Sequence, residues 1–186
     1  MWRDYFAGLQ REYRSDEYQE GVADYEGYKI EVTRTWEPGP FVEIRILFNK
    51  LYGDPGKYEE MNPHRTESIR LRAKTVMQNE ENRDYDYVVG TSTYKYWPSL
   101  NLGYIESAVV NPKMRKKGIG ITLINFIIEY LRSKGCQRIY SFAVNREGYR
   151  LLINTNFIHE PPEDPANLWR RWFFYNINHV NYSSLD

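Results

Sequence analysis

The sequence is short of the residues that cross-link small proteins or bind metals. Cys136 is the one cysteine among 186 residues, so no disulfide can form within the chain. The three histidines, His64, His159 and His179, are scattered without the spacing of a metal site. We therefore expect no metal, and the single thiol, which we expect to be buried, fits a reducing compartment.

Long apolar runs and net charge are also lacking. The most apolar segment, 121–131, is interrupted by Asn125 and Glu129 and is far shorter than the ~20 residues that span a bilayer. No apolar stretch of signal-peptide type is found near residue 1. Basic and acidic residues balance at 25 each, so no global field favours nucleic acid. We expect a soluble cytoplasmic protein of one domain, 1–186, with no membrane or nucleic-acid partner.

The periodicity of apolar residues and the turn signals divide the chain into predicted helices, strands and loops. Helical spacing of apolar residues predicts an N-terminal helix over 2–13 and a clear helix over 119–133, with Gly135 beyond its end. Strand-like alternation covers 28–35, 42–48, 68–75, 85–97, 101–110, 138–144, 157–160 and 168–177. Residues 51–64 read as a loop, and 68–75 also fit a helix.

The most informative stretch is 109–120, VVNPKMRKKGIG, which places a strand, a basic turn and a helix start in succession. A helix start leaves several N–H groups without intrahelical partners and carries the positive end of the helix dipole. Gly118 and Gly120 let the backbone bend and approach a ligand, and four of the five residues 113–117 are cationic. These features favour a pyrophosphate site.

Two other phosphate motifs fit this stretch less well. A Walker loop needs Gly-x-x-x-x-Gly-Lys-Ser/Thr, and a dinucleotide fingerprint needs three glycines with an acidic residue about 20 positions on. Only Gly118 and Gly120 are present here. The structural alternative is an ordinary tight turn before a helix.

The motif Arg115-x-x-Gly118-x-Gly120, entered from a strand ending in Val109-Val110, resembles the coenzyme-A-binding signature of the GNAT superfamily of N-acyltransferases. The likeness extends over about 103–158, through a following strand and a helix that opens with Asn145. It implies an α/β fold with a mixed, mostly antiparallel sheet of about seven strands and helices on both faces. Residues 1–100 would then form the acceptor side, 101–158 the acetyl-CoA-binding core and 159–186 a C-terminal hairpin.

The resemblance also implies that acetyl-CoA is the acyl donor, held in a gap between Val110 and the strand from Arg138. The implied pyrophosphate cradle is Arg115, Lys116, Lys117, Gly118, Ile119 and Gly120. Main-chain groups of Val109 and Val110 would hold the pantetheine arm, and one of these N–H groups would polarise the acyl carbonyl. Asn145 would touch the pantetheine chain while also serving as a helix N-cap.

Candidate catalytic groups lie on the strand before the signature and on the helix after Asn145. Strict alternation would place Tyr104, Glu106 and Ala108 on one face, where Glu106 could serve as general base; the alternative is a surface ion pair. In the family a tyrosine lies seven residues past the Asn and protonates the leaving thiolate, but here that position is Leu152. Tyr149, one helical turn earlier, or water would have to substitute.

The expected activity is acetyl transfer from acetyl-CoA to a primary amine, either a small molecule or a protein. The alternative is a non-catalytic acyl-CoA-binding or interaction module, supported by Leu152. The acidic run 80–86 could attract a cationic acceptor, although a solvated loop is the simpler interpretation. The aromatic stretch 168–175 is a candidate homodimer surface.

Overall fold

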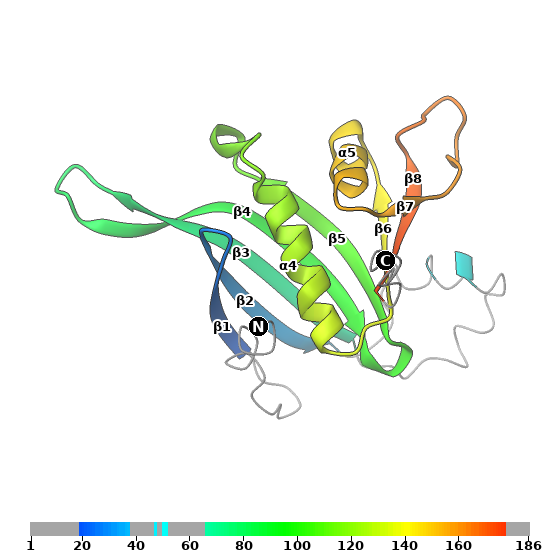
Figure 1. Cartoon of the computed structure of the whole chain (residues 1–186), viewed down its shortest axis with the longest axis horizontal. Coiled ribbons are helices and arrows are strands. Elements are labelled where there is room, and N and C mark those ends of the chain that lie inside the picture. The colour runs from blue at the N-terminus through cyan, green and yellow to red at the C-terminus, as the bar shows by residue number, and fades with distance from the viewer. Residues whose placement is uncertain (1–18, 38–46, 48–49, 52–65, 178–186) are drawn as a thin grey trace, which may run out of the picture.

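The computed structural model describes residues 19–37, 47, 50–51 and 66–177, and the N-terminal helix and the 51–64 loop expected from the sequence lie almost wholly outside them. Eight strands form one sheet in the order β1-β2-β3-β4-β5-β6-β8-β7 (Figure 1). Only β5 and β6 run parallel. The strands are β1 Gln19–Tyr25, β2 Tyr28–Glu37, β3 Thr66–Gln78, β4 Asp84–Trp97, β5 Leu102–Val110, β6 Arg138–Ala143, β7 Ile158–His159 and β8 Arg171–Asn176. Within residues 66–177 the helices are α4 Ile119–Ser133 and α5 Arg146–Asn154, with short 3-10 turns η1 Pro98–Leu100 and η2 Pro112–Met114.

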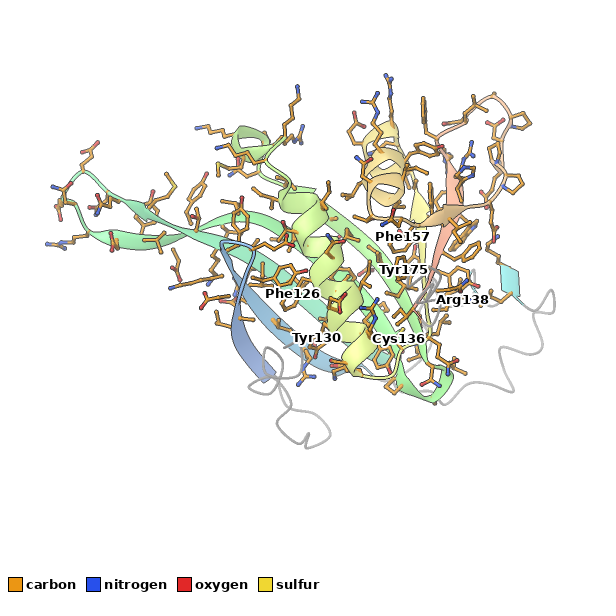
Figure 2. The ribbon with its side chains drawn as sticks, in the orientation of Figure 1. Phe126, Tyr130, Cys136, Arg138, Phe157 and Tyr175 are labelled. Atoms are coloured by element: carbon orange, nitrogen blue, oxygen red, sulfur yellow. The ribbon has the colours of Figure 1, made fainter. Side chains whose placement is uncertain are left out.

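Helix α4 covers one face of the sheet and supplies most of the main core. Its buried stripe recurs every three or four residues, the pattern of an amphipathic helix. Phe126 and Tyr130, one turn apart, stack with their ring centroids 6.3 Å apart (Figure 2). Gly135 ends the helix in the left-handed region at φ 86°, and its N–H donates to the Arg132 carbonyl, as expected of a C-terminal cap. Helix α5 packs into the same core through Leu152.

The opposite face of the sheet carries a smaller aromatic cluster. Side chains alternate across a strand, so Trp97, Leu102, Tyr140 and Trp172 lie on the face away from α4. Leu47, fully buried, packs into this cluster. The aromatic residues of the sequence are thus divided between two faces of one sheet.

The strands β5 and β6 separate partway along their length. Their parallel ladder joins Leu102–Ile105 to Arg138–Ser141 and stops there. At the last pair the Ser141 hydroxyl donates to the Ile105 carbonyl over 3.3 Å, which fixes the point of separation. We call this point the fork, and Figure 1 shows β5 and β6 diverging beyond it.

The mixed, mostly antiparallel sheet and the helix bounds at 119–133 confirm the sequence expectations, with two corrections. The sheet has eight strands because β1, whose Gly21 and Ala23 give little strand signal, pairs with β2. Within the predicted strand 42–48 only Leu47 is described, and it is helical. Leu47 and Leu51, four residues apart, pack together on the far-face cluster, the spacing of one helix face.

Candidate functional site

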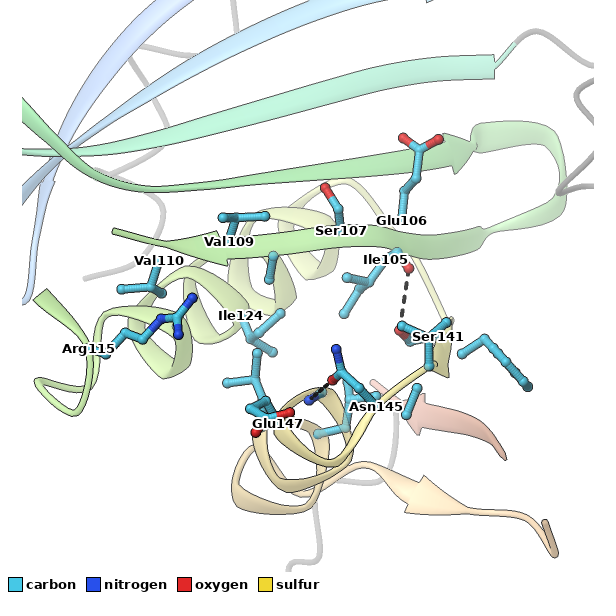
Figure 3. Close-up of a pocket in the computed structure, with 18 residues that line it drawn as sticks. Ile105, Glu106, Ser107, Val109, Val110, Arg115, Ile124, Ser141, Asn145 and Glu147 are labelled. Atoms are coloured by element: carbon cyan, nitrogen blue, oxygen red, sulfur yellow. Dashed lines mark hydrogen bonds between the residues drawn. The ribbon is translucent and has the colours of Figure 1, made fainter. Parts of the chain in front are cut away.

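A cavity of about 580 Å³ opens between β5 and β6 beyond the fork (Figure 3). Consecutive residues of β5 form one wall, and residues at the end of β6 form the other. Residues of α4 and α5 form the floor. The lining comprises Ile105–Val110, Ser141–Asn145, Arg115, Gly120, Ile124, Glu147, Gly148, Leu151 and Leu152. The cavity is mostly apolar with a few polar groups, which is the usual character of a small-molecule site.

The start of α4 lies at one end of this cavity. Asn111 begins the turn by accepting a hydrogen bond from the Lys113 N–H over 3.0 Å. Gly118 then takes φ 78°, a left-handed conformation that L-residues with a Cβ rarely adopt. The first intrahelical bond runs from the Thr122 N–H to the Gly118 carbonyl, so the N–H groups of 119–121 have no intrahelical partner. These donors are available to an anion.

The cations of the turn surround the helix start. Lys113, Arg115, Lys116 and Lys117 are all exposed. Within residues 66–177, no carboxylate forms an ion pair with any of them; the Lys117 ammonium contacts only the Met114 sulfur. Positive charge from the side chains therefore adds to that of the helix dipole.

Gly120 fits the site for a different reason than Gly118. A Cβ built on Gly120 would lie 3.3 Å from Leu151 Cδ1 and 3.6 Å from Val110 Cγ2. The absent side chain lets the first turn of α4 approach both β5 and α5. A larger residue at this position would fill the cavity or push α4 and α5 apart.

A β-bulge interrupts β5 at the fork. Thr93 pairs with Ser107 but the next residue, Tyr94, pairs with Ile105, so Glu106 is an extra residue. The alternation therefore shifts: Tyr104 packs on the far-face cluster, whereas Ala108 packs on the α4 core. The prediction that Ala108 shares a face with Tyr104 and Glu106 was wrong because it assumed unbroken alternation.

The bulge directs Glu106 and Ser107 to the same side of β5, away from α4 (Figure 3). The Ser107 hydroxyl is 2.7 Å from that of Thr93. The Glu106 side chain is exposed, and no described residue forms a hydrogen bond or ion pair with its carboxylate. The predicted alternative, a surface ion pair for Glu106, is not found among the described residues.

Asn145 closes the opposite wall. Its side-chain oxygen accepts a hydrogen bond from the Gly148 N–H over 2.8 Å and so caps α5, as the sequence predicts. The side-chain nitrogen then points into the cavity (Figure 3). The cap fixes the orientation of this donor, since the oxygen is already engaged.

The model of the GNAT acetyltransferase family matches residues 41–151, more than half of the chain. The chain belongs to this family. Among solved structures, an acetyltransferase from Bacillus cereus is 20% identical over 75% of this chain and 95% of its own, with a TM-score of 0.46. The dodecameric spermidine N-acetyltransferase of Vibrio cholerae is 15% identical over 82% and 98%, with a TM-score of 0.45. No curated protein sequence matches.

The GNAT signature residues come together as a group in the structure. Arg115, Gly120, Val109, Val110 and Asn145 all line the cavity, and Gly118 and Ile119 form the start of α4 beside it. Lys116 and Lys117 lie in the exposed turn. The residues predicted from the family resemblance to hold a diphosphate thus lie at or beside one end of the cavity.

Tyr149, the candidate general acid, and Leu152 lie in different surroundings. Leu152 lines the cavity, but Tyr149 does not. The Tyr149 ring packs on Trp169 and Phe173, with centroids 5.1 and 5.5 Å away, and the Arg171 guanidinium lies 5.2 Å from its centroid. Side chains three residues apart on a helix point about 60° apart around its axis. This difference directs Tyr149 toward β8 while Leu152 faces the cavity. Tyr104 is likewise absent from the lining.

Sequence reasoning missed three polar residues of the cavity: Ser107, Ser141 and Glu147. Ser107 depends on the bulge and Ser141 on the register of β5 with β6, and neither is a local property of the sequence. Glu147 could have been found, since an acidic residue in the first turn of a helix is a recognisable signal.

Cys136 lies in the main core, just beyond the end of α4. Burial raises the pKa of the Cys136 thiol to about 12, so it is a buried, inert thiol as expected. Among the described residues, no cluster of metal-ligating side chains is found. In that same part of the chain, no helix is long and apolar enough to span a bilayer.

Proposed function

We propose that this protein transfers an acetyl group from acetyl-CoA to a primary amine. One observation carries the proposal: at the start of α4, amides without intrahelical partners and exposed cations lie at one end of an apolar gap between two separated strands. The amides and cations at the start of α4 suit a diphosphate, and the apolar gap suits a pantetheine arm. The single buried thiol, Cys136, supports the cytoplasm as the place of action.

Each group has a role that its position supports. Arg115 and the N–H groups of 119–121 would hold the diphosphate. Beyond the fork, no described strand pairs with β5 on its β6 side, so main-chain groups of Val109 and Val110 could bind the pantetheine amides. A main-chain N–H there would donate to the acyl oxygen as it gains charge. Acetyl-CoA supplies the activated acyl carbon as a thioester.

Glu106 is the proposed general base. The acceptor nitrogen must be neutral, and an alkyl ammonium titrates near ~10.4, so a proton has to leave. As nitrogen bonds to the acyl carbon, the carbon–sulfur bond breaks and its electron pair leaves with sulfur. The amine proton goes to Glu106 and on to solvent, and the thiolate takes a proton from water. The products are an amide and free CoA thiol.

The test measures thiol release from acetyl-CoA with a panel of amines. Glu106→Gln should lower kcat/KM by about a hundredfold, the usual size of a general-base effect. Glu147→Gln, which removes the other carboxylate of the cavity, is the matched control and should retain most activity. An unchanged rate in Glu106→Gln would remove Glu106 from the mechanism.

Leu152 favours a second candidate, a module that binds acyl-CoA without transfer. Leu152 is 4% exposed at the cavity wall, and its side chain cannot donate a proton to a thiolate. Tight calorimetric binding of CoA, with no thiol release across amines and peptides, would support this candidate over the enzyme.

A further inference from the structure

A row of directly paired polar residues crosses the face of the sheet away from α4 and ends beside the fork. The cross-strand partners, one from each of β2 to β5, are Thr33, Arg70, Thr93 and Ser107. Leu71 and Tyr94, which follow Arg70 and Thr93, belong to the main core, so alternation places the row on the opposite face. We call these four residues the polar row. Arg70 and Ser107 are exposed, and Thr33 and Thr93 are half-buried.

The polar row joins the proposed acetyl-transfer cavity at its β5 end. Ser107 and its neighbour Glu106 both line the cavity, on the side of β5 away from α4 (Figure 3). The Ser107 and Thr93 hydroxyls, 2.7 Å apart, connect β5 to β4 across the row. Arg70 lies directly opposite Thr93, on a strand two spacings, or about 10 Å, from β5. A carboxylate and a guanidinium thus lie at opposite ends of a short polar strip.

Arg70 differs from the other cations that β3 and β4 place on this face. Arg72 and Lys74 both pair with Glu31 of β2. The Lys95 ammonium donates to a serine hydroxyl of β3 over 3.1 Å. No described residue forms a hydrogen bond or ion pair with the exposed Arg70 guanidinium. Its planar fork of donors suits two-point binding of a carboxylate or phosphate.

We infer that the acceptor is a primary amine that also carries an oxyanion, a carboxylate or a phosphate, several bonds from its nitrogen. The nitrogen would reach Glu106 at the fork, and the oxyanion would pair with Arg70 at the other end of the strip. The two ligand charges would then match the protein charges in order, whereas a second ammonium would be repelled by Arg70. Arg70 would be the specificity-determining residue. This inference rests on the proposed acetyltransferase function.

The experiment measures CoA thiol release by the full-length protein with four amines of one chain length. Two are anionic, ε-aminocaproate and aminohexyl phosphate; n-hexylamine lacks the second charge, and hexamethylenediamine has a second ammonium. We expect kcat/KM for at least one anionic amine to be about tenfold or more above n-hexylamine, the effect of a charge-assisted hydrogen bond. The diamine should be the poorest substrate. The preferred anionic amine identifies the oxyanion.

Variants of two neighbouring arginines on this face locate the effect. Arg70→Gln should reduce the ratio of anionic amine to n-hexylamine about tenfold. Arg70→Lys should retain part of the ratio, because it keeps the charge but loses the planar fork. Arg72→Gln is the matched control: it lies two residues further along the same face of β3 but is already paired with Glu31. It should leave the ratio unchanged.

Failure of the inference and failure of the proposed function give different results. Turnover of n-hexylamine or the diamine as fast as that of both anionic amines would overturn the inference and keep the acetyltransferase. So would an equal loss of the ratio in Arg70→Gln and Arg72→Gln. Absence of thiol release with every amine would overturn the enzyme. Calorimetry of the anionic amines with the CoA-loaded protein would then decide the role of Arg70, which requires weaker binding in Arg70→Gln than in Arg72→Gln.

Discussion

The two ends of α4 both gather positive charge, but the protein treats that charge in opposite ways. At the N-terminal end the cations of the 113–117 turn are exposed and have no described acidic partner. At the C-terminal end Arg34 and Lys134 converge on Glu67, with side chains that are 3%, 19% and 1% exposed. The first arrangement leaves donors for a ligand, and the second uses them within the fold.

The C-terminal cluster is also tied to aromatic rings. The Arg34 guanidinium donates to the Tyr130 hydroxyl, and both Arg34 and Lys134 lie within 6 Å of the Tyr130 ring centroid, at 5.7 and 5.3 Å. The Tyr96 hydroxyl donates to the Lys134 carbonyl over 3.0 Å. One helix therefore carries the proposed ligand site at its start and a buried charge cluster at its end.

Glu67→Gln should have the largest effect on the contrast between the two ends of α4. It removes the buried carboxylate that pairs with buried Arg34 and half-buried Lys134, so the free energy of unfolding should fall by about 3–5 kcal/mol. Urea denaturation measures the change. The control is Glu81→Gln, which breaks the exposed Arg83–Glu81 pair and should change stability by less than about 0.5 kcal/mol. Similar losses in the two variants would mean that the buried cluster is not the stabilising end.

Gly118→Ala tests the N-terminal end. The left-handed φ of 78° costs an L-residue about 1–2 kcal/mol, and relief of that strain would turn the 119–121 amides away from the cavity. CoA affinity should fall about tenfold by calorimetry, equivalent to about 1.4 kcal/mol.

Gly27→Ala is the matched control for Gly118→Ala. Gly27 has φ 84° in the β1–β2 turn, and a Cβ at either glycine would meet no atom within 4 Å. Both variants should lose similar stability, but only Gly118→Ala should lose CoA affinity. Equal CoA affinity in the two variants would mean that the turn at Gly118 does not contribute to CoA binding.

Lys134 gives a smaller, pH-dependent test of the C-terminal end. Burial lowers the pKa of this ammonium, with the nearby Glu67 charge opposing the shift. The folded pKa is below the unfolded value of ~10.4, so the unfolded chain binds more protons in that window and stability rises with pH through it. Lys134→Met removes this contribution. Its free energy of unfolding should therefore rise less steeply than that of the wild type as the pH increases toward 10.

Local signals predicted one side of this contrast and not the other. The start of α4 is encoded within a dozen residues, so the basic turn, Gly118 and the bounds of the helix could be read directly. The left-handed conformation of Asn156 after α5, at φ 65°, is local too, since Asn tolerates it. The C-terminal cluster joins Arg34, Glu67 and Lys134 from β2, β3 and the end of α4. No short pattern announces such a contact.

The same distinction explains the errors at the site. The bulge at Glu106 is a property of how β4 pairs with β5, and it reversed the predicted face of Ala108 relative to Tyr104. Tyr149 packs on the rings of Trp169, which precedes β8, and of Phe173, which belongs to β8, and so lies away from the cavity. Pairing and packing between distant segments decided both placements, after local structure had fixed the strand and the helix.

The most direct test of the central claim compares CoA with pantetheine by calorimetry on the same protein. If the amides and cations at the start of α4 bind the diphosphate, pantetheine should bind about a hundredfold more weakly, the loss of two or so charge-assisted hydrogen bonds. The difference should shrink in Gly118→Ala but not in Gly27→Ala. Equal affinity for CoA and pantetheine in the wild-type protein would contradict the account.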